Sequence, residues 1–94
     1  MKRYISLIRF TEQGAKAIKN STSRAHAFKE AAAKAGVKIE CQYWTLGACD
    51  GILIISADQE SKALHLLAEL AAAGNVSTET MQAFTDTEFE ALVK

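Results

Sequence analysis

Few residues of this chain have the type and spacing that catalysis requires. His26 and His65 lie among lysines and glutamates in segments with helical periodicity, and neither has a base, nucleophile or metal ligand at helical spacing. Cys41 and Cys49 do not form a CxxC pair, and no second pair exists, so they indicate neither a zinc site nor a disulfide framework. Phosphate-binding loops, nucleophile elbows and paired carboxylates are absent as well. We expect no catalytic residue, no metal and no cofactor.

Four other side chains are candidates for binding a small molecule. Trp44, near a turn, is expected to floor a pocket together with Tyr4 and Ser6, and Arg9 has the charge to bind a carboxylate. Each has a structural alternative. The sequence favours Trp44 as the anchor of an interface between two copies of the chain, and it favours Arg9 as the partner of an acidic neighbour at a strand end.

The composition limits the classes of partner. Ninety-four residues suffice for one domain, residues 1–94, with its own core. Eleven basic residues balance eleven acidic ones, so no net field favours nucleic acid or a membrane surface. The start of the chain lacks the apolar stretch of a signal peptide, and no run approaches the roughly 18 residues of a membrane span. We expect a cytoplasmic protein without nucleic-acid or membrane partners.

The periodicity of apolar residues predicts the elements that position these side chains. Strands are expected over residues 3–10, 37–44, 51–57 and 76–84. Helical segments are expected over 11–19, from about 21 to 35, from Asp58 to about 73, and from Thr85 to 92. Thr11, Asp58 and Thr85 fit helix N-caps, and Gly36 fits a helix end.

This βαββαβ order predicts an α+β fold of the ferredoxin-like type, with an antiparallel sheet in the order 4-1-3-2. Residues 3–10 and 51–57 are apolar at both parities, which is typical of central strands with both faces covered. They occupy the two central positions of that order. A six-residue turn between the middle strands pairs Trp44 with Gly51 and Cys41 with Ile54.

Two helices cover only one face of such a sheet, so the sequence must also indicate which face stays open. We expect the more apolar parity to face the helices, which places Ile39, Cys41, Tyr43, Ile52 and Ile54 on the covered face. The other parity places Trp44, Leu53 and Ile55 on the open face beside charged residues. Because exposed apolar patches commonly mark interfaces, we expect Trp44, Leu53 and Ile55 to form the contact of a homodimer.

Three segments resemble the GYD domain family over essentially the whole chain: residues 4–11 (YISLIRFT), residues 43–47 (YWTLG) and residues 74–80 (GNVSTET). The resemblance implies a ferredoxin-like domain that dimerises face to face into an α+β barrel, and it implies no defined activity. In the Gly, Tyr, Asp signature of the family, Gly47 and Asp50 match, whereas Cys49 stands at the tyrosine position. Any role of an aromatic ring there is therefore in doubt. Gly47 and Asp50 also have ordinary uses in turns.

Two functions of different classes are compatible with this sequence. The first is a non-enzymatic homo-oligomer that binds a small molecule or a partner. The second is a cofactor-free enzyme of the dimeric α+β barrel type, such as a monooxygenase or an enzyme that decarboxylates or isomerises a small aromatic substrate. The second depends on analogy of fold alone. On the open face only Glu40, Glu79 and Arg9 have suitable groups, so the sequence favours the first.

Overall fold

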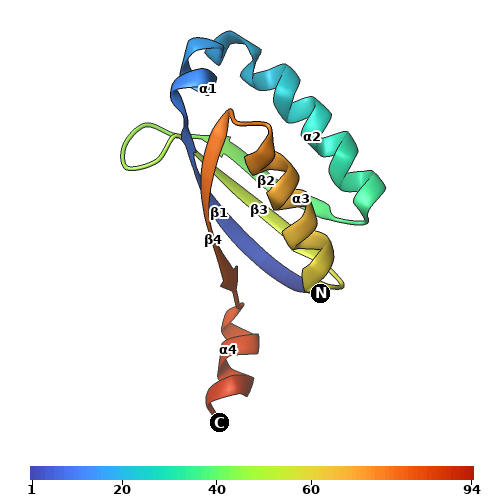
Figure 1. Ribbon diagram of the computed structural model, residues 1–94. Coiled ribbons are helices and arrows are strands. Elements are labelled where there is room, and N and C mark those ends of the chain that lie inside the picture. Colours follow the sequence, from blue (N-terminus) through green and yellow to red (C-terminus); the bar gives the residue numbers. More distant parts are fainter.

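The computed structural model describes residues 1–94 and contains a four-stranded antiparallel sheet with two long helices on one face (Figure 1). The strands are β1 (Lys2–Phe10), β2 (Lys38–Trp44), β3 (Gly51–Ala57) and β4 (Val76–Ala83). The helices are α1 (Glu12–Lys16), α2 (Ser21–Ala35), α3 (Glu60–Ala72) and α4 (Asp86–Val93), and a single 3₁₀ turn, Ile18–Asn20, joins α1 to α2. No helix combines the length and apolar character needed to cross a membrane.

The topology confirms the predicted ferredoxin-like fold. The sheet order β2-β3-β1-β4 is the predicted 4-1-3-2 order counted from the other edge, and β1 and β3 are its central strands. The predicted hairpin register is also confirmed, because Trp44 pairs with Gly51 and Cys41 with Ile54. Both cysteine thiols are free.

Local signals in the sequence explain most helix ends. The Thr11 side chain accepts a hydrogen bond from the Gly14 amide, and Thr85 forms a reciprocal capping box with Glu88. Gly36 ends α2 in the left-handed region, with φ of 77°. The prediction that Asp58 caps α3 was wrong. Gln59 occupies the cap position without a side-chain bond, and Asp58 instead pairs with Lys62 at 3.1 Å.

The predicted assignment of the two sheet faces was wrong. Leu53 and Ile55 are 1% and 0% exposed and pack beneath the helices, so neither is available to a partner. The predicted division of β3 residues between the two faces of the sheet is right. The error is that the helices cover the face of Leu53 and Ile55 and not the face of Ile52 and Ile54. A β-bulge between Ile39 and Cys41 adds to it, because one extra residue reverses the parity of β2. Ile39 therefore packs against the core, while Cys41 pairs with Ile54 on the opposite face.

The core lies between the sheet and helices α2 and α3. Its nine buried apolar residues are Tyr4, Ala32, Val37, Leu53, Ile55, Ala57, Ala63, Leu66 and Leu67. Ser6 is fully buried among them, and its hydroxyl lies 2.7 Å from that of Thr80 on the neighbouring strand.

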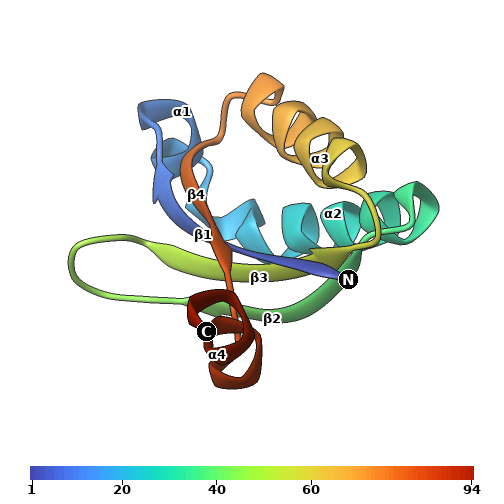
Figure 2. The ribbon, with the colours of Figure 1, turned by 90° about the horizontal axis from the view of Figure 1, so that it is seen from below.

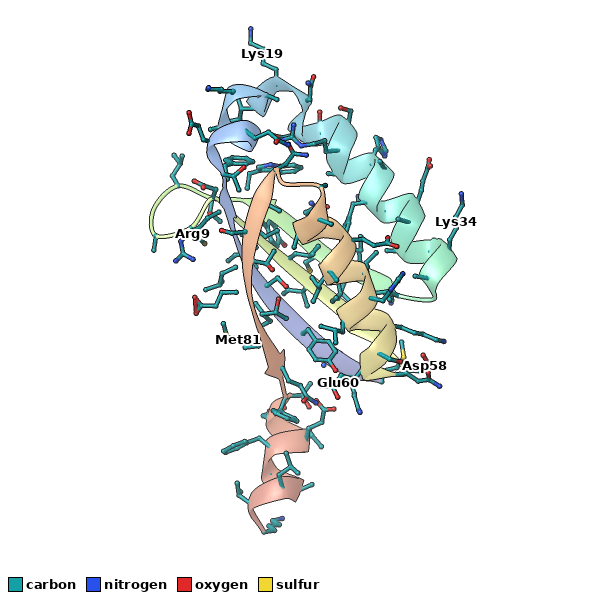
Figure 3. The ribbon with its side chains drawn as sticks, viewed as in Figure 1. Arg9, Lys19, Lys34, Asp58, Glu60 and Met81 are labelled. Atoms are coloured by element: carbon teal, nitrogen blue, oxygen red, sulfur yellow. The ribbon has the colours of Figure 1, made fainter.

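No helix covers the other side of the sheet. This open face is made of Ile5, Leu7, Cys41, Tyr43, Ile52, Ile54 and Met81. Met81 points away from α3 in Figure 3. At the rim, Arg3 donates a 2.8 Å hydrogen bond to Glu40, which raises the pKa of the Arg3 guanidinium.

Helix α4 projects beyond the sheet and lies on the side opposite α2 and α3 (Figures 1 and 2). All of its residues are exposed, including an apolar stripe of Phe89, Leu92 and Val93 at helical spacing. Both the open face and this stripe thus present apolar side chains to solvent.

Candidate functional site

A cleft of about 370 Å³ opens between α2, the second half of α3 and one end of the sheet. Figure 2 shows the two helices lying side by side above that sheet. Thirteen of the twenty lining residues are hydrophobic. The apolar walls include Ile8, Phe10, Ala27, Phe28, Ala31, Trp44, Leu66 and Leu70. We call this the Trp44 cleft; its size and apolar lining are typical of small-molecule sites.

Each wall of the Trp44 cleft comes from a different element. Helix α2 supplies Phe28 through the same apolar stripe that carries the buried Ala32. Strand β2 ends at Trp44, whose side chain is half exposed and lines the cleft. The predicted role of Trp44 as a wall residue of a pocket therefore has a geometric basis, although the pocket lies on the helix side of the sheet.

The polar groups of the cleft are few, and most of them, Asn75 included, are held by internal bonds. Arg24 donates to the carbonyl of Ala17 at 2.9 Å and to the Ser21 hydroxyl at 3.3 Å, which fixes its guanidinium at the start of α2. The Asp50 carboxylate accepts a 2.8 Å hydrogen bond from the Phe10 amide. Gln42, Glu69 and Asn75 complete the polar lining.

The hairpin loop carries the partly matched Gly, Tyr, Asp signature, and its bonds explain two of the three positions. Gly47 has φ of 134°, a region that favours glycine. The Asp50 amide donates to the carbonyl of Ile8 at 2.7 Å while its carboxylate holds Phe10. Asp50 thereby ties the loop to the end of β1. Cys49 lies 3.6 Å from the Thr45 hydroxyl and does not line the cleft.

The structure separates the four predicted ligand-binding residues. Only Trp44 lines the Trp44 cleft. Tyr4 and Ser6 share its sheet face, but Ser6 is sealed in the core and Tyr4 lies toward the other end of the sheet. Arg9 projects on the opposite face, where it donates to the carbonyl of Ala48 at 3.1 Å and lies 4.0 Å from Glu79 (Figure 3). These residues do not form one site.

Sequence reasoning missed Arg24, Phe28 and Leu70 as residues of the cleft. Phe28 and Leu70 carried a signal, since Phe28 lies three or four residues from Ala25 and Ala32, and Leu70 three or four from Leu66 and Leu67, which is the spacing of one apolar stripe on a helix. A stripe shows that a side chain faces inward but not whether it meets another side chain or a cleft. No group of three or more histidine, cysteine, aspartate or glutamate side chains is arranged to hold a metal ion.

The fold and the loop define a class: a ferredoxin-like α+β domain with a glycine and an aspartate in the loop between β2 and β3. The chain belongs to the GYD domain family, whose family model matches residues 4–93. No curated protein and no solved structure matched the sequence.

Proposed function

We propose that this protein binds a small, largely apolar molecule in the Trp44 cleft and does so as a homo-oligomer. The observation that carries the proposal is the cleft itself, where aromatic and aliphatic walls from α2, α3 and the sheet enclose about 370 Å³. A few polar groups at the edge suit one or two hydrogen bonds that would orient the ligand.

Binding is supported better than catalysis because the charged groups are already engaged. Arg24 is bonded within the start of α2, and Asp50 fixes the end of β1. A general base or acid needs a group that is free to exchange a proton with the substrate. The alternative, a cofactor-free enzyme on an aromatic substrate, would have to use Glu69, which is exposed and pairs with His65 at 2.9 Å.

Self-association is supported by two unpartnered apolar surfaces on one side of the sheet. The open face exposes Tyr43 and Met81 by 60% and 43%, and α4 exposes Phe89 and Leu92 by 58% and 64%. A helix of eight residues is marginal in isolation. A two-fold arrangement brings the open face of each copy against the other and offers each α4 a surface to pack on.

The Trp44 cleft is tested by binding of 1-anilinonaphthalene-8-sulfonate, with Trp44 as the reporter. Since Trp44 is the single tryptophan, its quenching by the bound dye reports proximity. Ala27 and Ala33 are both exposed residues of α2, but only Ala27 lines the cleft. We expect Ala27→Phe to weaken binding by about tenfold or more because it fills the site, and Ala33→Phe to bind like the parent. Equal binding by both variants would place the dye elsewhere and refute the site.

A further inference from the structure

The hydroxyl of Tyr4 is buried without a hydrogen-bond partner. The residue is 7% exposed and its hydroxyl oxygen is shielded from water, so solvent does not supply the missing bond. Buried polar groups in folded proteins nearly always have a partner, because desolvating one without compensation is unfavourable. Tyr4 therefore calls for a partner that the folded chain itself does not provide.

Tyr4 lies in a second cleft, of about 500 Å³, between α3 and the edge strand β4. We call it the Tyr4 cleft; it shares no lining residue with the Trp44 cleft. The helix side is mostly apolar and consists of Ala63, Leu64, Leu67 and Ala68, with the charged Glu60 at the start of the helix. The strand side is polar and consists of Thr78, Thr80 and Gln82. Such a cleft fits a molecule with one apolar side and one polar edge.

The charges of the cleft select against an anion. Glu60, in the first turn of α3, lines the same cleft as Tyr4 (Figure 3 labels Glu60). Burial, and to a lesser degree the nearby Glu60 carboxylate, raise the pKa of the Tyr4 phenol. Tyr4 is therefore a neutral hydrogen-bond donor near pH 7, beside a carboxylate that repels negative charge.

We propose that the Tyr4 cleft is a second binding site, for a small neutral molecule whose carbonyl oxygen accepts a hydrogen bond from the Tyr4 hydroxyl. The apolar part of the ligand packs on Leu64 and Leu67, and Thr78 and Gln82 carry further groups for its polar edge. Because the hydroxyl is shielded in the free protein, a side chain of the cleft moves when the ligand enters. The proposal does not depend on binding in the Trp44 cleft.

The test compares acetophenone, which has a carbonyl, with ethylbenzene, which lacks one, and with benzoate, which is an anion. Amide resonances in ¹H–¹⁵N spectra are followed during titration of the parent protein and of Tyr4→Phe. In the parent, acetophenone is expected to bind about fivefold more tightly than ethylbenzene, the worth of one hydrogen bond. Its shifts should lie in β4 and the first half of α3. Benzoate should bind more weakly than acetophenone.

Tyr4→Phe is expected to remove the advantage of acetophenone and leave ethylbenzene unchanged. Its Tm without ligand should equal or exceed that of the parent, because the removed hydroxyl makes no bond. The proposal is overturned if the two neutral probes bind the parent alike, if benzoate binds most tightly, or if Tyr4→Phe lowers the Tm. Shifts confined to Phe28 and Trp44 would also overturn it, while supporting the Trp44 cleft. Shifts confined to β4 and α3 leave the Trp44 cleft to its own dye test.

Discussion

Substitutions at two adjacent residues of β3 should affect different properties, folding stability at Leu53 and self-association at Ile54. The reason is that Leu53 lies under the helices and Ile54 lies on the open face. Leu53 is 1% exposed, so Leu53→Ala leaves a cavity and should lower the free energy of unfolding by about 2–5 kcal/mol. That is a large part of the roughly 5–15 kcal/mol of a typical domain. At 4–8 °C per kcal/mol for a domain of this size, the Tm should fall by at least about 8 °C.

Charged substitutions at the same two positions separate the core from the interface. Leu53→Asp buries an unpaired carboxylate and should not fold. Ile54→Asp should keep the circular dichroism spectrum of the parent while halving its mass in sedimentation, because only the contact between copies is lost. The effect of Leu53→Ala on unfolding should not change with protein concentration, whereas that of Ile54→Asp should. A folded monomer from Leu53→Asp would refute the assignment of the faces, and a monomeric parent at tens of micromolar would refute the interface.

Two further predictions concern helix α1 and the start of α4. A Cβ at Gly14 would lie 1.9 Å from the carbonyl oxygen of Asn75, so Gly14→Ala should lower the Tm by several degrees in a thermal melt, whereas the exposed neighbour Ala15→Ser should not. Hydrogen bonds from the Thr85 backbone amide, then from its side chain, lower the pKa of Glu88 below its ordinary value of 4.5. The capping box therefore stabilises α4 above that value and is lost as the pH falls through the lower pKa of the folded state; amide exchange in α4 should rise at acidic pH in the parent but change less in Glu88→Gln.

The sequence predicted the order of the elements, the strand order and the hairpin register because these depend on local signals. Alternation, caps and turn residues are readable without knowledge of the rest of the fold, and Gly36 and Thr85 behave as such signals indicate. The bulge beside Glu40 has no comparable signal in the sequence, because any residue can occupy a bulge. Its effect is that residues of β2 on its two sides no longer alternate between the faces in a single register. The Trp44 cleft was only partly predictable for a similar reason: the stripes of α2 and α3 do not specify how far apart the helices lie.

The error over the two faces also strengthens the case for self-association. The prediction assumed that the helices cover the more hydrophobic face of the sheet. Along β1, however, the helices cover Tyr4, Ser6 and Ile8 and leave Ile5 and Leu7 uncovered. Along β3 they cover Leu53 and Ile55 and leave Ile52 and Ile54 uncovered. A single copy thus turns the more aliphatic parity of its two central strands toward solvent. Contiguous aliphatic surface of this kind is costly to hydrate, and a second copy offers the same surface in complementary orientation. Ile54→Asp examines this reasoning directly, because it changes that surface and nothing in the core.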